Sequence, residues 1–165
     1  MTDYTRSADW ERSLNSLLPL FGHRNWIVVA DWAYPAQSKP GVFTISANAD
    51  QMSVVRKVSE AIATSKHVRA NVYLDRELAF VDEKDAPGIS AYRSELNALI
   101  HGAAVQHLPH QQIIAKLDQA AEIFRVLVIK TDMTIPYTSV VFELDCGYWD
   151  SDAEKRLREG MLSNV

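Results

Sequence analysis

Two residues that can transfer protons flank a short apolar run near the start of the chain. His23 precedes the run at residues 26–30, and Asp31 follows it directly. Imidazole titrates near neutral pH and can both donate and accept a proton, and a nearby carboxylate can orient it or bind a substrate hydroxyl. In the alternative interpretation, His23 caps the preceding helix and Asp31 caps the element that follows.

A second group of polar residues lies in the later part of the chain. His110 follows Pro109 in the first turn of an expected helix, and its neutral imidazole is a usable base. The connection at residues 130–139 carries Lys130, Tyr137 and Ser139, and the phenol can donate a hydrogen bond to a sugar or carbonyl oxygen. A solvated loop with one packed tyrosine is the alternative.

Two aromatic residues, Trp32 and Tyr34, follow the apolar run. Aromatic faces stack on the C–H faces of sugars, but they also simply pack in protein cores. A metal site built from His101, His107 and His110 is possible, but their spacing matches no strong ligand motif, and no Gly-rich phosphate loop is present.

Hydrophobic periodicity predicts the elements that hold these residues. Unbroken apolar runs indicate strands buried on both faces, whereas alternating patterns indicate half-buried strands. The predicted strands are residues 26–30, 42–45, 68–74, 124–130 and 139–144, and the predicted helices are residues 7–18, a segment after Asp50 that includes 54–62, 90–100, 109–123 and a segment from 151 onward. This alternation predicts a layered α/β sandwich with a mostly parallel sheet. Asp31 then lies at the carboxyl end of its strand, where such sheets place ligand crevices.

Length and charge narrow the functional classes. The chain has 165 residues, 47% hydrophobic, with a formal net charge of −4, and no basic block indicates nucleic-acid binding. No apolar run approaches the roughly 20 residues of a membrane helix. Cys146 is the one cysteine and the N-terminal residues are polar, so we expect a cytoplasmic protein. We expect one domain over residues 1–165, with a C-terminal helical extension at about 149–165.

Two separated segments resemble the D-ribose pyranase / L-fucose mutarotase family. The first segment is Gly22-His23 followed by Val28-Val29, Asp31 and Pro35, and the second is Val128-Ile129-Lys130-Thr131 followed by Pro136-Tyr137 and an apolar strand. The order of elements between them also agrees. The resemblance implies the family's α/β fold and a non-redox interconversion of sugar anomers or ring forms without a cofactor.

The resemblance also implies roles for individual residues. His23 matches the family's acid–base histidine, Asp31 its sugar-binding or orienting aspartate, His110 the histidine at the head of the late helix, and Tyr137 the tyrosine after proline. Lys130, Ser139, Trp32 and Tyr34 are the further substrate-binding candidates. Family members form rings whose sites are shared between neighbouring subunits, so a ring-like homo-oligomer is expected.

The sequence departs from the family pattern at several positions. Ser139 stands where asparagine is usual, Asp132-Met133 where Gly-Glu is usual, and Ile114 where a lysine is expected. These departures keep two alternatives open. One is a catalytically impaired sugar-binding protein on the same scaffold, and the other is a metal-dependent hydrolase or isomerase that uses His23, Asp31 and His110.

Overall fold

The computed structural model describes residues 4–163, with side chains from Asp9 onward. Helices and strands alternate along most of the chain, as the periodicity predicts. The helices are α1 (Tyr4–Leu17), α2 (Gln51–Thr64), α3 (Ile89–Leu99), α4 (His110–Ala120) and α5 (Ser151–Ser163), with short 3₁₀ turns at Leu18–Leu20 and Arg76–Phe80. The strands are β1 (Trp26–Ala30), β2 (Val42–Ser46), β3 (Val68–Asp75), β4 (Ala104–Leu108), β5 (Val126–Lys130) and β6 (Val140–Cys146).

The strands form one mixed sheet in the order β2-β5-β1-β6-β3-β4. Strand β1 pairs in parallel with β5, and β5 with β2, while β3 pairs in parallel with β4. Strand β6 is antiparallel to both of its neighbours, β1 and β3. Within the described residues, β6 is therefore the single strand that runs against the others, and the prediction of a mostly parallel sheet is confirmed.

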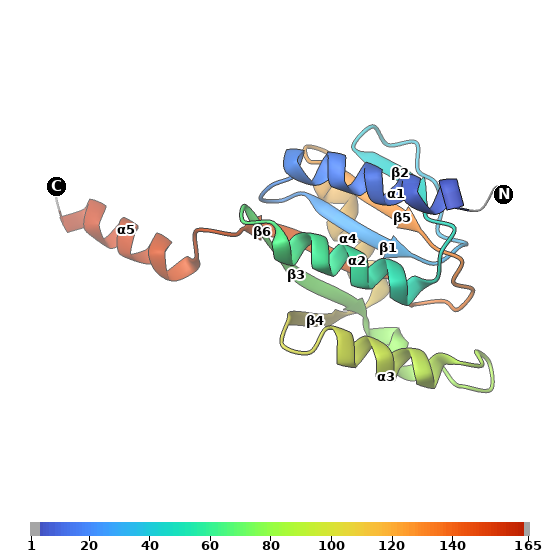
Figure 1. Cartoon of the computed structure of the whole chain (residues 1–165). Helices are drawn as coiled ribbons and strands as arrows, with labels where there is room; N and C mark the ends of the chain where they lie inside the picture. Colours follow the sequence, from blue (N-terminus) through green and yellow to red (C-terminus); the bar gives the residue numbers. More distant parts are fainter. Residues whose placement is uncertain (1–3, 164–165) are drawn as a thin grey trace.

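Helices cover both faces of the sheet (Figure 1). Alternate residues of β1 point to opposite faces because the side-chain period of a strand is two. Ile27 and Val29 join the core cluster that contains residues of α1, α2 and α3, whereas Trp26, Val28 and Ala30 join the cluster that contains residues of α4. All five residues of β1 are buried, so the strand forms the centre of a three-layer sandwich.

Strand β4 is the one strand of the described sheet that the sequence did not predict. It lies at the sheet edge, pairs only with β3 and has no buried residue in the pattern along Ala104–Leu108. An exposed edge strand with a polar sequence gives no apolar signal. The prediction of helix from 109 to 123 is also too long, because α4 ends at Ala120.

The last helix, α5, extends away from the body of the sandwich (Figure 1). Asp150 caps its start by accepting a hydrogen bond from the Ala153 backbone nitrogen at 2.7 Å. Among the described residues, none of the helices is long and apolar enough to span a membrane.

Candidate functional site

The carboxyl edge of the parallel strands gathers most of the predicted polar residues. Asp31 follows β1, and Asp75 is the last residue of β3, which runs parallel to β1 because both are antiparallel to β6. Tyr137 precedes β6, whose first residue, Val140, pairs with Val29 of β1. The start of β6 and the ends of β1 and β3 therefore meet at one edge.

At this edge the surface forms a hollow of about 410 Å³, which we term the carboxyl-edge hollow. It is lined by Asp31, Ala33, Tyr34, Pro35, Gln37, His110, Gln111, Ile114, Pro136 and Tyr137. A second hollow of about 410 Å³ shares Asp31 and Pro136 with the first and adds Trp32. These volumes fall in the range of about 300–1,000 Å³ typical of small-molecule sites. Four of the predicted residues, Asp31, Tyr34, His110 and Tyr137, thus line one hollow within one chain.

Two carboxylates hold His110, one at its imidazole and one at its backbone nitrogen. Its Nδ1 lies 3.1 Å from Oδ2 of the buried Asp75, and its backbone nitrogen donates to both oxygens of Glu77 at 3.0 and 3.1 Å. The Glu77 carboxylate thereby satisfies a free N–H at the start of α4 and complements the positive end of the helix. A carboxylate at Nδ1 favours the tautomer with the proton there, which leaves Nε2 as the nitrogen free to act on a ligand.

Tyr137 lies beside His110 in an unusual backbone conformation. The two rings meet edge to face with centroids 5.5 Å apart. The φ of Tyr137 is +60°, a left-handed conformation that a bulky residue adopts only when its surroundings impose it. The turn Pro136-Tyr137 therefore directs the phenol toward the imidazole.

A buried network fixes the loop that carries Tyr137. The Gln51 side-chain nitrogen donates to the carbonyls of Val29 and Thr138, and its oxygen accepts from the Thr131 hydroxyl at 2.7 Å. The Tyr92 hydroxyl also donates to the Thr138 carbonyl at 2.6 Å. These bonds connect the end of β1 to the segments before β6 and after β5, so the hollow has rigid walls.

The hollow is acidic and partly desolvated. Burial raises the pKa of Tyr34 to about 12, and the charges of Asp118, Asp75 and Asp31 add to the increase. Burial also raises the pKa of Asp75 above its ordinary value, although the neighbouring His110 partly opposes this change. At neutral pH the Tyr34 phenol is therefore protonated and is a hydrogen-bond donor, while carboxylates nearby act as acceptors.

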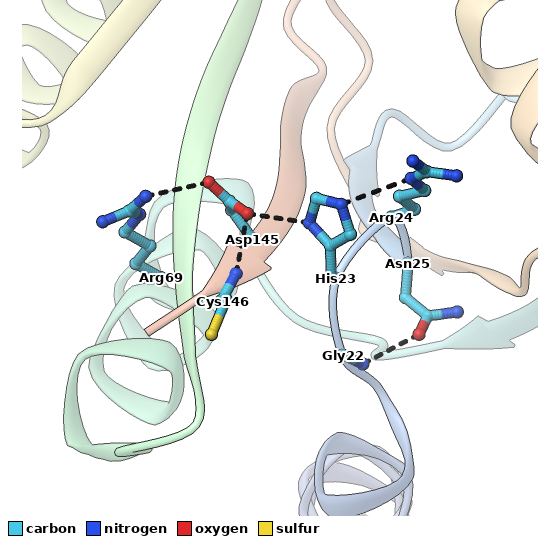
Figure 2. Close-up of polar contacts among 7 residues, drawn as sticks. All are labelled: Gly22, His23, Arg24, Asn25, Arg69, Asp145 and Cys146. Atoms are coloured by element: carbon cyan, nitrogen blue, oxygen red, sulfur yellow. Dashed lines mark hydrogen bonds and ion pairs between the residues drawn. The ribbon is translucent and has the colours of Figure 1, made fainter. Parts of the chain in front are cut away.

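His23 lies at the opposite edge of the sheet, so the expectation that it shares one hollow with Asp31 is not met within a single chain. It precedes β1, and the other groups around it come from the amino end of β3 and the carboxyl end of β6 (Figure 2). Its Nδ1 lies 2.7 Å from Asp145 Oδ1, and Asp145 Oδ2 accepts from Arg69 at 3.0 Å. The physical reason is the strand itself, because β1 extends the chain by about 3.3 Å per residue between the two edges.

The imidazole of His23 is oriented from both sides. Arg24 Nε donates to its Nε2 at 3.2 Å, so Nδ1 carries the proton and donates it to Asp145 (Figure 2). The imidazole side chain is 59% exposed. Burial by itself would raise the pKa of Asp145, but hydrogen bonds from Arg69, from the Cys146 backbone nitrogen and from His23 together lower it below its ordinary value.

The other predicted substrate-binding residues divide into two groups. Tyr34 lines the carboxyl-edge hollow, and Trp32 lines the adjoining one with its ring largely exposed. Neither Lys130 nor Ser139, both within the described part of the chain, lines these hollows. Ser139 is nearly buried, and Lys130 is the last residue of β5.

Sequence reasoning missed several residues of the site. Asp75 is one of them. It is the last residue of a predicted half-buried strand, just as Asp31 directly follows a buried one, and this position at the carboxyl end of a strand could have identified Asp75. Gln37 and Gln111 contribute amides to the hollow. Ile114, at the position expected to hold a lysine, contributes an apolar wall, and Lys116 instead packs its ammonium over the ring of Tyr73.

A metal centre built from His23, Asp31 and His110 is not formed within one chain, because His23 is at the other edge. More generally, no group of three or more His, Cys, Asp or Glu side chains in the described residues is arranged to hold a metal ion.

Comparison with known proteins gives one family and several solved structures. The model of the RbsD / FucU transport protein family matches residues 9–146. The structure of Bacillus subtilis RbsD complexed with D-ribose is 19% identical, with a TM-score of 0.56 over 81% of this chain and 91% of that one. Fucose mutarotase from Streptococcus pneumoniae in complex with L-fucose is 16% identical, with a TM-score of 0.52 over 81% and 91%. FucU from Bifidobacterium longum is 15% identical, with a TM-score of 0.54 over 81% and 94%. No curated protein sequence matches.

Proposed function

Because the chain belongs to the RbsD / FucU transport protein family, we propose that it binds a monosaccharide in the carboxyl-edge hollow and interconverts the anomers or ring forms of that sugar. The observation that carries the proposal is the pairing of His110 with the buried Asp75 at a hollow that also contains Asp31 and Tyr137. The sugars in two structures of similar fold, D-ribose and L-fucose, are the first ligands to test.

The chemistry requires two proton transfers. Opening of a sugar ring needs a proton delivered to the ring oxygen and another removed from the anomeric hydroxyl, and closure reverses these roles. Nε2 of His110 is the free base, and the phenol of Tyr137 or an imidazole from elsewhere is the acid. Positioned acid–base groups typically contribute about 10²–10⁴-fold in rate. Neither a metal nor an organic cofactor is required for such transfers.

Asp31 and the amides of Gln37 and Gln111 have a binding role in this proposal. Carboxylate and amide oxygens accept hydrogen bonds from sugar hydroxyls, and the amide nitrogens donate to them. The apolar wall at Ile114 packs against C–H groups of the ring. Trp32, largely exposed at the adjoining hollow, extends this apolar surface.

We propose further that His23 completes the site from a neighbouring copy in a homo-oligomer. This is supported by three observations: the residue is exposed, its orientation is fixed by Asp145 and Arg24, and it lies at the opposite edge from Asp31. A heterologous contact between copies brings opposite edges together and closes into a ring when the rotation permits. A cytoplasmic location, expected from the sequence, is part of the proposal.

Exchange NMR tests the activity directly. Saturation transfer between the anomer signals of D-ribose and of L-fucose measures the rate in the presence of wild-type protein, of His110→Ala and of His107→Ala. His107 is a matched control because it is exposed on β4, away from the hollow. We expect acceleration by wild type and by His107→Ala, and the spontaneous rate with His110→Ala. Equal acceleration by both variants would refute a role for His110.

A sugar-binding protein without catalysis is the second candidate. Two observations favour it: Ile114 replaces the expected lysine in the hollow, and Ser139, in place of asparagine, does not line it. A thermal shift with a sugar, combined with an exchange rate no higher than in buffer, would identify this function instead.

A further inference from the structure

Helix α5 keeps its large apolar side chains exposed in its own chain. None of its residues, all of which the structure describes, is buried, and Leu157, Met161 and Leu162 are exposed large apolar side chains. The helix lies beyond residues 9–146, the segment that matches the family model. Isolated helices of about 12–15 residues are marginal in water, and most helices are stabilised by packing of an apolar face. We therefore expect this 13-residue helix to be stabilised by packing its apolar face against another surface.

The body of the same chain presents an unfilled apolar groove of about 300 Å³. The groove lies between α2, β3 and the end of α3, and we term it the α2–α3 groove. Its apolar walls are Ile62, Val68, Val72, Leu99, Ile100 and Phe142. Ser59, Arg69 and His101 add polar groups. A groove of this composition is typical of sites that accept the apolar face of an amphipathic helix.

The groove adjoins the base of α5. Arg69 lines both the groove and the hollow formed by Trp149, Ser151 and Glu154 at the start of the helix. The Gly147 backbone nitrogen also donates to the His67 carbonyl at 2.9 Å. This bond holds the segment that leads to α5 beside the start of β3. From this point α5 nevertheless extends away from the body (Figure 1).

We propose that α5 packs in the α2–α3 groove of a second copy of this chain, which places its own α5 in the groove of the first. Helix α5 begins beside the groove of its own chain but points away from it. When two copies face each other, each α5 can reach the groove of the other copy, and the beginnings of the two helices lie close together. Exchange of identical elements is a low-cost route to self-association.

The helix and the groove match in size and in apolar character. Leu157 and Met161 are four residues apart and share one face of α5. A groove of about 300 Å³ accommodates a few side chains of this kind. The first turn of α5 is acidic, with Asp152 and Glu154, whereas the polar residues at the groove include Arg69 and His101. Arg69 is paired with Asp145 and Glu154 with Arg158 in the same chain, so the match between the helix and the groove depends on their apolar side chains.

Cross-linking between differently tagged chains tests the exchange. In a Cys146→Ser background, one chain carries Leu157→Cys on the apolar face of α5 and the other carries Ala63→Cys, an exposed residue at the groove. A short bis-maleimide joins the two cysteines after co-expression of the full-length chains. The matched control is Lys155→Cys, which lies on the opposite face of the helix, and circular dichroism checks that every variant is folded.

We expect a cross-linked species containing both tags with Leu157→Cys, and loss of that species with Lys155→Cys. Addition of Met161→Asp to the Leu157→Cys chain should also abolish it. A chain that carries both cysteines and cross-links only within itself would overturn the proposal in favour of closure onto its own groove. Equal yields at positions 157 and 155, or no cross-link at either, would overturn it as well. None of these outcomes depends on sugar chemistry.

Discussion

His23 and Asp31 lie eight residues apart at opposite ends of the buried strand β1, one at each edge of the sheet. Strand β1 pairs along its whole length with β5 and over Trp26–Val29 with β6, and this extended, paired strand keeps the two residues apart within one chain. Each nevertheless has a defined setting. Asp31 faces a hollow with His110 and Tyr137, and His23 is hydrogen-bonded to Asp145 and Arg24.

A mixture of two inactive variants should recover activity if His23 acts on the hollow of a neighbouring copy. His23→Ala and Asp31→Asn should each reduce anomer exchange by about 10²–10⁴-fold. Co-expression of the two with different tags should restore about a quarter of the wild-type sites, because random neighbours pair an intact hollow with an intact imidazole in one of four arrangements. Exchange NMR on the purified mixed assembly gives the measurement, and separate assemblies mixed without subunit exchange are the control.

Asp75→Asn should reduce turnover with little effect on sugar binding. An asparagine amide can donate to His110 Nδ1 as well as accept from it, so the tautomer with a free Nε2 is no longer favoured. We expect a fall in kcat of about 10²-fold, within the range for positioned acid–base groups, and a KM within a factor of about three. Glu95→Gln, on the exposed side of α3, is the control. An unchanged kcat would show that His110 needs no carboxylate partner.

Tyr137→Phe isolates the role of the hydroxyl, because the ring keeps its edge contact with His110. If the phenol delivers the proton to the ring oxygen, the rate of anomer exchange should fall by about 10²-fold or more, while the thermal midpoint changes little. Tyr148→Phe, at an exposed position before α5, should leave the rate unchanged. Full activity in Tyr137→Phe would assign the acid to an imidazole or to water.

The ion pair between Asp145 and Arg69, at the edge of the sheet where His23 lies, should stabilise the protein only above acidic pH. The folded-state pKa of Asp145 is lower than its ordinary value, so the stabilisation is complete above the unfolded pKa and is lost as the pH falls through the folded one. Asp145→Asn should cost about 0.5–1 kcal/mol at pH 6, as is usual for a partly exposed pair, and less at pH 3. Denaturant unfolding at both values measures this, and a constant difference would contradict the assignment.

Gly41→Ala should destabilise the fold, because the added Cβ would lie 2.2 Å from the Ala121 carbonyl oxygen. That oxygen belongs to the backbone just after α4 and can move only with the helix, so we expect a loss of about 1–3 kcal/mol in the free energy of unfolding. Gly22→Ala is the matched control, since its Cβ would meet no atom within 4 Å. Similar thermal midpoints for both variants would show that the backbone at the end of α4 can shift to accommodate the added Cβ at little cost in stability.

Local patterns in the sequence were sufficient to predict the layered α/β architecture. The apolar run at residues 26–30 is a buried strand, and the run predicted at 124–130 is a strand from Val126 onward, without its first two residues. The amphipathic spacing of Val54, Val58 and Ile62 gives a helix whose apolar face is buried. Such strands and helices can be predicted from short stretches of sequence, because the period of the apolar residues matches the geometry of the strand or the helix. Strand β4 has no such signal because its residues stay exposed at an edge.

The site could be predicted only in part, because its geometry depends on strand order. The sequence identified Asp31, His110 and Tyr137 by residue type and by position at element ends, and the fold brings them together. It did not identify Asp75, which becomes the partner of His110 only because β3 runs parallel to β1 and places its last residue at the same edge.

The sequence by itself determined which segments are buried and which chemical groups are available, because both follow from residue type and periodicity. Only the tertiary structure decided that His23 and Asp31 face different surfaces and that α5 leaves its apolar face uncovered. Both outcomes depend on contacts between residues far apart in the chain. Such contacts form only when the strands and helices pack together, and local patterns of residue type and periodicity do not show which of them form.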